Sequence, residues 1–496
     1  MAYKAVQGDP FNAERLRAGW VYGAHIKGGQ IVRGWVRKEE IFEVEKLKDL
    51  EAAYRREVKK VRTDSARRLA AESIALAQAK TDGNKLREAL DRITDAIELT
   101  PGLPELHYAR GVLNTGLHRY SVAYQDFNAA IKADRRYAAA YQARGDLLLK
   151  ARDYAGAESD YTSVIALRPK DPLSYFKRGS GRFEAEDYAG AISDFTKANQ
   201  LDPRNVQFYL ARARAYSLTG GDDQAIQDYT QALSLQPDSP SIYLARAEIL
   251  LRMRRTEEAL EDLSRAVELN PKHAEPHYRR ALLYQQLGKL EEALSDISKA
   301  IELSPRAQEY YSKQGEIAEK AKEFATAIAS YSKIIELVPD YAEAYYRRGL
   351  CLEKLAKNKE AAKDYSAAIE LDPHFAGAYL RRGALYEVAF NDPDKALADY
   401  SAAIRADGSL AEALQRRALL HLRFERRKKA LTDISRVVEL QPRNAEAYYL
   451  RSTIFRSLGN HSKAIDDLNA AVRLEPENSS YIATLKEVQG EAKGRN

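Results

Sequence analysis

The chain has 496 residues, of which 45% are hydrophobic and 30% are charged, and its formal net charge is +6 at pH 7. This composition is typical of a chain that folds in water, and so small a charge does not by itself indicate a nucleic-acid or anionic-membrane partner. The single cysteine, Cys351, excludes an intrachain disulfide. No apolar run approaches the ~18 residues that span a bilayer, and the first residues lack the order of a signal peptide. We therefore expect a soluble protein with no membrane span, cytoplasmic by default.

Residues 1–45 differ from the rest of the chain and contain both tryptophans, Trp20 and Trp35. Their pattern predicts short strands with a tight Gly-Gly turn, at 20–22, 27–32 and 34–37. The ending GWVRKEEIFEV resembles the last strands of small SH3-like barrels, although the resemblance covers only part of such a barrel. It implies either a small β appendage that packs on the helices or an incomplete ligand-binding barrel.

The chain becomes helical over residues 46–101. Apolar residues recur at spacings of three and four along 47–61, which predicts an amphipathic helix. Thr63 to Ser65 predicts a break and an N-cap for a second helix over 66–79, and a third helix is expected over 86–99. Together, 66–101 form a divergent first repeat of the unit described next.

A strict 34-residue period begins at Pro104, taken here as position 1, and gives eleven repeats over 104–476. One extra residue enters at 391–393. Each repeat predicts two amphipathic helices, as over 274–287 and 290–303, which need neighbouring copies to bury their apolar faces. Position 8 is always small, so the two helices can approach closely. These residues are Gly111, Gly145, Gly179, Ala213, Ala247, Ala281, Gly315, Gly349, Gly383, Ala418 and Ser452.

Two further positions complete the pattern. Position 4 is mostly tyrosine, as in Tyr311 and Tyr345, and position 32 is mostly proline, as in Pro305 and Pro339. The chain resembles the tetratricopeptide repeat family in its 34-residue period and in the positions of its small residues, its aromatic residue and its proline. The resemblance implies an all-α, right-handed α-solenoid of stacked hairpins, with the first helices lining an inner groove that binds proteins or peptides. Residues 477–496 are expected to add a capping helix and tail.

The repeats also predict an internal ion pair. Position 7 is arginine and position 23 is aspartate in ten repeats, and one repeat lacks both, with Gln314 and Ser330 instead. This joint loss indicates that the two residues pair within one hairpin. An exposed pair contributes about 0–1 kcal/mol, but a ladder of pairs fixes the register of the helices. Representative pairs of this structural brace are Arg280 with Asp296 and Arg348 with Asp364.

Position 6 is the candidate binding feature, because it becomes basic from the sixth repeat onward. The stripe consists of Arg279, Lys313, Arg347, Arg381 and Arg416, with Tyr278 and Tyr346 beside two of them. It could attract an acidic peptide or a nucleic-acid backbone. Position 2 is often glutamate in the same repeats, and an i, i+4 pair would neutralise the stripe. The three interpretations stay open at this stage, with nucleic acid the least favoured.

The chain lacks a phosphate loop, a nucleophile elbow and a histidine–cysteine cluster. We therefore expect no enzyme, no metal and no cofactor. The lysine–asparagine clamp of repeats that grip a C-terminal carboxylate is absent, since position 5 is never lysine and position 9 is never asparagine. The favoured function is a non-enzymatic scaffold or adaptor. The alternatives are a nucleic-acid-binding helical repeat and a cell-envelope assembly factor with an SH3-like module.

Overall fold

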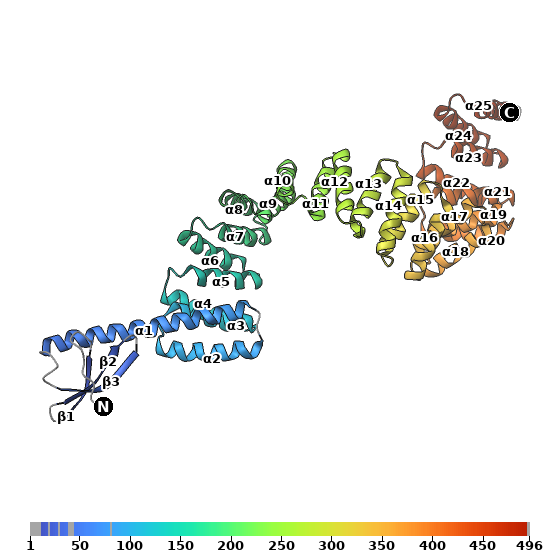
Figure 1. Ribbon diagram of the computed structural model, residues 1–496. Coiled ribbons are helices and arrows are strands. Elements are labelled where there is room, and N and C mark those ends of the chain that lie inside the picture. Colours follow the sequence, from blue (N-terminus) through green and yellow to red (C-terminus); the bar gives the residue numbers. More distant parts are fainter. Residues whose placement is uncertain (1–10, 18–19, 28–29, 38–43, 80–81, 494–496) are drawn as a thin grey trace. The chain divides into compact units, whose positions relative to one another are not determined.

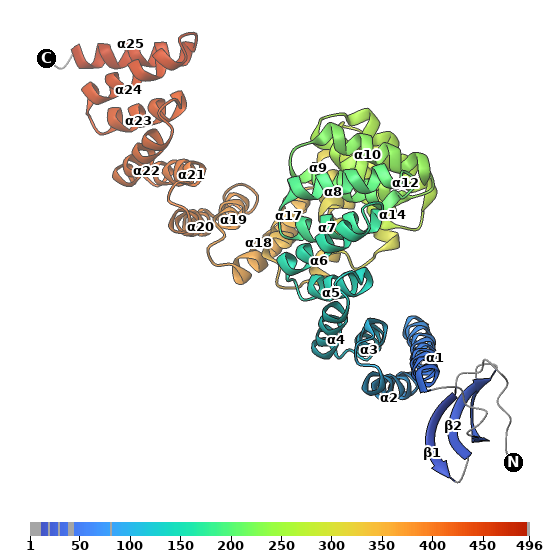
Figure 2. The same cartoon turned by 90° about the vertical axis from the view of Figure 1, so that its left-hand side faces the viewer.

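The computed structural model describes residues 11–17, 20–27, 30–37, 44–79 and 82–493. The chain forms two compact units, residues 1–253 and 254–496, and each is described by itself. Figures 1 and 2 show helical hairpins following one another along each unit.

The first unit begins with a three-stranded antiparallel sheet of order β1-β2-β3. Its strands are β1 (Phe11–Arg17), β2 (Trp20–Lys27) and β3 (Gln30–Arg37). Tyr22 of β2 lies opposite Trp35 of β3. The expected separate strands before and after Gly34 form one strand, and β1 was not predicted. The expected turn at Gly28–Gly29 lies outside the described residues.

The next helix corrects a prediction. α1 (Val44–Gln78) is continuous, and the break expected at Thr63 is absent. The Thr63 hydroxyl donates to the Lys59 carbonyl at 2.8 Å, so it bonds inside the helix instead of capping a new one. α2 (Gly83–Leu99) follows, capped by the Asp82 carboxylate, which accepts from the Asn84 amide.

Twenty-three further helices lie within the described residues. In the first unit these are α3 (Pro104–Gly116), α4 (Tyr120–Ala133), α5 (Ala138–Lys150), α6 (Tyr154–Leu167), α7 (Pro172–Glu184), α8 (Tyr188–Leu201), α9 (Val206–Leu218), α10 (Asp222–Leu235) and α11 (Pro240–Arg252). In the second unit they are α12 (Thr256–Leu269), α13 (Ala274–Gln286), α14 (Leu290–Leu303), α15 (Gln308–Lys320), α16 (Phe324–Leu337), α17 (Ala342–Lys354), α18 (Asn358–Leu371), α19 (Ala376–Val388), α20 (Pro393–Ala406), α21 (Ala411–Arg423), α22 (Arg427–Leu440), α23 (Ala445–Ser457), α24 (His461–Leu474) and α25 (Ser479–Lys493).

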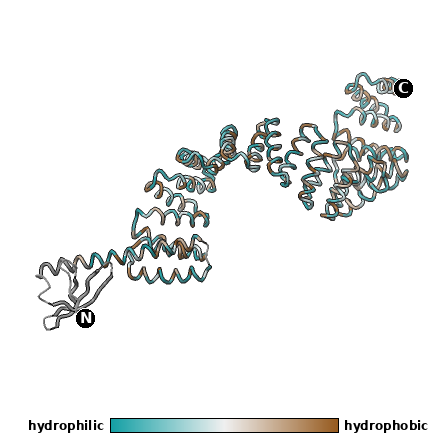
Figure 3. The backbone as a smooth tube through the Cα atoms, in the orientation of Figure 1, coloured by the Kyte–Doolittle hydropathy of each residue, from teal (hydrophilic) through white to brown (hydrophobic). Residues whose placement is uncertain are grey.

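Each hairpin packs through its small residues. Ala281 and Ala293 are fully buried between α13 and α14, and Gly288 turns the chain between these helices with φ of +74°. Hydrophobic and hydrophilic stretches alternate along the helices in Figure 3, as amphipathic packing requires.

In ten of the eleven repeats the residue at position 8 is matched to the residue at position 24, which it faces across the hairpin; the exception is Ala213 with Tyr229. Ala281 faces the aliphatic Ile297, whereas Gly315 faces Tyr331. A Cβ added at Gly315 would lie 2.6 Å from the Tyr331 ring, closer than carbon atoms pack. Glycine at position 8 therefore makes room for an aromatic ring, which is a narrower role than close helix approach alone.

The last helix, α25, covers the end of the second unit. Tyr481 and Val488 are buried against α23 and α24, and the neighbouring residue Lys486 is exposed. Across the described residues, no helix has both the length and the apolar character that crossing a bilayer requires.

Candidate functional site

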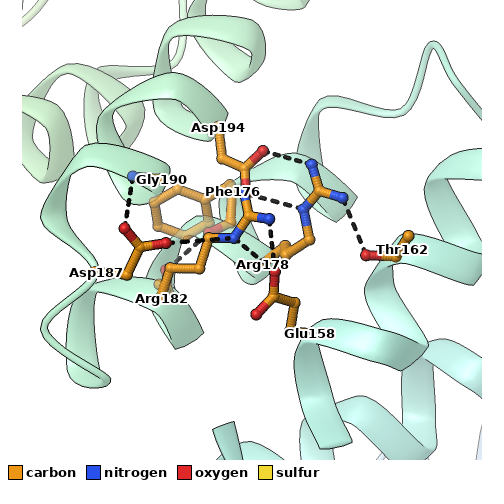
Figure 4. Close-up of polar contacts among 9 residues, drawn as sticks. Glu158, Thr162, Phe176, Arg178, Arg182, Asp187, Gly190 and Asp194 are labelled. Atoms are coloured by element: carbon orange, nitrogen blue, oxygen red, sulfur yellow. Dashed lines mark hydrogen bonds and ion pairs between the residues drawn. The ribbon is translucent and has the colours of Figure 1, made fainter. Parts of the chain in front are cut away.

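The predicted arginine–aspartate pairs have a third member. In Figure 4, the Arg178 guanidinium donates to both Asp194 oxygens, from Nη2 at 2.7 Å and from Nε at 2.9 Å. Its Nη1 donates to the Thr162 hydroxyl, which belongs to the preceding repeat, at 3.0 Å. The arginine thus joins its own hairpin to the neighbouring one. We call this arrangement the Arg–Asp–hydroxyl clamp.

The same geometry is present at the pairs singled out from the sequence. Arg280 Nε lies 2.6 Å from Asp296 Oδ2, and Arg348 Nε lies 2.7 Å from Asp364 Oδ2. Their Nη1 groups donate to Ser264 and Ser332 at 3.2 and 2.9 Å. The hydrogen bonds to Asp296 raise the pKa of Arg280 above its ordinary value. Both aspartates are buried, so the pairs are not surface pairs of the weakest kind.

The exceptional repeat keeps the clamp without charge. The Ser330 hydroxyl donates to Gln314 Oε1 at 2.8 Å, and Gln314 Nε2 donates to the Ser298 hydroxyl at 2.9 Å. Sequence reasoning missed the hydroxyl, although position 25 repeats visibly. The hydroxyls at position 25 that accept a hydrogen bond from position 7 of the following repeat are those of Thr162, Thr196, Thr230, Ser264, Ser298, Ser332, Ser366 and Ser401.

Three cations of the basic stripe have the expected i, i+4 glutamate. Arg279 Nε lies 2.6 Å from Glu275, Arg347 Nε lies 2.7 Å from Glu343, and Arg416 Nε lies 3.0 Å from Glu412. The other two find different partners. Lys313 Nζ lies 2.9 Å from Glu316 on its own helix, and Arg381 pairs with Glu353 of the preceding repeat.

The stripe is also tied to carboxylates of the preceding repeats. Glu319 accepts a hydrogen bond from the Tyr331 hydroxyl at 2.5 Å and lies 3.6 Å from Arg347 Nη1. Glu387 does the same with Tyr400 at 2.5 Å and Arg416 at 3.5 Å. Every cation of the stripe therefore lies against at least one carboxylate.

The two flanking tyrosines pack into the wall of the solenoid. The Tyr278 ring lies 4.6 Å from the Tyr310 ring, and its hydroxyl donates to Glu309. The Tyr346 ring lies 5.8 Å from Tyr365 and 4.7 Å from Phe375. Both act as structural side chains in this conformation.

A cavity of about 210 Å³ opens between α15, α16 and α17. Its lining includes Ser312, Tyr331, Tyr341, Glu343 and Arg347. Among the residues predicted for the site, Arg347 lines this cavity. The sequence signal for it is Ser312, a small residue at position 5, where other repeats carry larger side chains.

Tetratricopeptide repeat models match residues 342–375, residues 182–249, and residues 115–172, 244–308, 278–342 and 415–479. These ranges cover more than half of the chain. The chain belongs to the tetratricopeptide repeat family. This confirms the resemblance inferred from the period, whereas the matches give the SH3-like resemblance of residues 1–45 no support.

Solved structures of other tetratricopeptide repeat proteins are similar to parts of the chain. YrrB, described as having an unusual peptide-binding site, is 24% identical, with 38% of this chain and 95% of YrrB covered and a TM-score of 0.34. MamA is 22% identical, with 35% and 94% covered and a TM-score of 0.33. The C-terminal part of a repeat protein from Cytophaga hutchinsonii is 19% identical, with 49% and 98% covered and a TM-score of 0.44. No curated protein sequence matches the chain significantly.

Proposed function

We propose that this tetratricopeptide repeat protein is a non-catalytic interaction scaffold. It binds an extended peptide along the surface formed by the first helix of each repeat in the second unit. The observation that carries the proposal is the pairing of every stripe cation with a carboxylate. A surface on which cations and carboxylates lie side by side complements a peptide that carries both signs. A nucleic-acid backbone instead requires cations that are available to replace its counterions.

The same pairing separates this proposal from nucleic-acid binding. A phosphate that approached Arg347 would have to displace Glu343 and compete with Glu319. We therefore expect weak RNA and DNA binding, with little dependence on salt between 50 and 200 mM, a range over which a protein with many phosphate contacts loses about 10³–10⁵ in affinity.

Charge reversal in the stripe tests the proposal. Proteins captured by the full chain are compared with those captured by an Arg347→Glu/Arg381→Glu variant. Reversal places new carboxylates beside Glu319 and Glu353, so we expect partners of this surface to be lost.

The matched control is Lys177→Glu, which changes position 6 in the first unit, where Lys177 pairs with Asp146 at 2.9 Å. It should leave the same partners bound. Circular dichroism would establish that each variant is folded. An unchanged partner list for the stripe variant would overturn the proposed surface.

A further inference from the structure

The cavity beside Ser312 lies where other repeats place an aromatic ring of their own. Position 5 is Tyr108 in the first repeat and Tyr346 in the eighth, but Ser312 in the seventh. The serine is too short to fill the same space, and the cavity of about 210 Å³ is the result.

The walls of this space are common to three repeats, which have an aromatic residue at both position 24 and position 34. The pairs are Phe127 with Tyr137, Tyr331 with Tyr341, and Tyr365 with Phe375. In the first repeat, the Tyr108 ring lies 5.8 Å from one wall and 5.5 Å from the other. In the eighth, the Tyr346 ring lies 5.8 and 4.7 Å from its walls. In the seventh, both walls line the cavity, and no side chain at position 5 reaches between them.

The polar end of the space can be placed in the same way. The Tyr278 hydroxyl donates to Glu309, which is position 2 of the next repeat. A Cβ added at Gly377, also at position 2, would lie 3.3 Å from the Tyr346 hydroxyl. A tyrosine at position 5 therefore presents its hydroxyl to position 2 of the following repeat. For the seventh repeat that residue is Glu343, which lines the cavity.

We propose that the cavity beside Ser312 binds the phenolic side chain of a tyrosine from a partner peptide. The ring lies between Tyr331 and Tyr341, in the contacts that Tyr108 makes in its own repeat, and the hydroxyl donates to Glu343. This carboxylate already accepts from Arg347 at 2.7 Å and has lone pairs left to accept a second donor. The partner ring also covers Tyr341, which is 39% exposed. The inference rests on the proposed function and names one side chain that the partner supplies.

A small probe tests the cavity without knowledge of the partner. Binding of p-cresol, the side chain of tyrosine, is measured on the full chain by ligand-observed NMR. Ser312→Tyr should fill the space, and we expect at least a tenfold loss of p-cresol affinity. Toluene should bind more weakly than p-cresol to the wild type, because it has no hydroxyl to donate to Glu343.

A second variant that fills the cavity controls for a folding defect in Ser312→Tyr. Ser312→Leu introduces the residue that three other repeats carry at position 5, and it should also block the probe. Gln415→Tyr, at position 5 of the tenth repeat, is the matched control and should leave binding unchanged. Unaltered p-cresol binding in both plugged variants would overturn the proposed cavity site, and equal affinity for toluene and p-cresol would overturn the hydrogen bond to Glu343.

Peptide selection then separates this inference from the broader one. Peptides selected on the wild type should share a tyrosine and lose binding to Ser312→Tyr but keep binding to Gln415→Tyr. If p-cresol binds the wild type and the Ser312 variants abolish this binding, but no peptide is selected, the cavity site is supported and the proposal of a peptide scaffold is refuted. If the selected peptides bind the plugged variants equally well, the scaffold stands and the role of the cavity in peptide binding fails.

Discussion

Replacing the charged clamp of the eighth repeat by the uncharged clamp of the seventh would measure how much the ion pair contributes to stability. Arg348→Gln removes two hydrogen bonds, at 2.7 and 2.8 Å, from a buried Asp364 carboxylate. Loss of one partner of a buried pair costs about 3–5 kcal/mol. The Arg348 and Asp364 side chains are 21% and 10% exposed, so water screens the pair in part and the loss should fall near 2–3 kcal/mol.

The double variant Arg348→Gln/Asp364→Ser should cost less than the single one. It reproduces Gln314 and Ser330, which already form neutral hydrogen bonds of 2.8 and 2.9 Å in this solenoid. We expect a net loss of about 1 kcal/mol, so adding Asp364→Ser to the Arg348→Gln variant should recover about 1–2 kcal/mol.

Hydrogen exchange of the amides in α17 and α18 is the appropriate assay, because long repeat arrays do not unfold as a single cooperative unit. The reverse exchange in the seventh repeat is the control. Gln314→Arg alone should increase local opening, and adding Ser330→Asp should restore protection. Equal or greater opening in the double variant than in Arg348→Gln would refute the reasoning.

Three further predictions concern the same region. Gly349→Ala should destabilise the hairpin by about 1–3 kcal/mol, measured by hydrogen exchange of α17 and α18, because its Cβ would lie 2.6 Å from the Tyr365 ring. In a Tyr365→Ile background the same change should stabilise the hairpin, because alanine is the better helix former. Destabilisation in both backgrounds would contradict this. Ala356→Gly should stabilise the turn between α17 and α18 by up to about 1 kcal/mol, because Ala356 has φ of +58°, where glycine carries no steric penalty. Faster hydrogen exchange of the α18 amides would be the contrary result. Burial, and to a lesser extent the neighbouring Glu319 carboxylate, raises the pKa of Cys351 to about 12. The thiol therefore stays protonated at pH 8 and should react slowly with a disulfide reagent there. Reaction at the rate of a free cysteine would disprove this prediction.

The sequence was sufficient for features that many repeats share. The helix over 290–303 was predicted to the residue, and the pairing of Arg280 with Asp296 followed from the joint loss at Gln314 and Ser330. Such inferences succeed because equivalent positions of the repeats have the same physical environment, so the repeats of one chain can be compared with one another.

Features that occur once were harder to predict. Thr63 was interpreted as a cap, because sequence cannot distinguish a capping hydroxyl from one that bonds the carbonyl four residues earlier. Lys313 was expected to pair with Glu309 four residues earlier, but Glu309 accepts a hydrogen bond from Tyr278 and Lys313 pairs with Glu316 instead. Ser312 carried no prediction of its own, because the cavity it leaves depends on Tyr331 of α16 and on Tyr341 just before α17.

The hydroxyl of the clamp has a consequence for how such a chain can lengthen. Seven arginines at position 7 donate to the position-25 hydroxyl of the preceding repeat, and the uncharged Gln314 donates to Ser298 at the same position. Among these repeats, the polar contact between neighbours is therefore interchangeable. A gene duplication that copies one whole repeat creates a junction already matched on both sides, so length can change in steps of one hairpin while an unusual repeat, such as the one with Ser312, keeps its own specialisation.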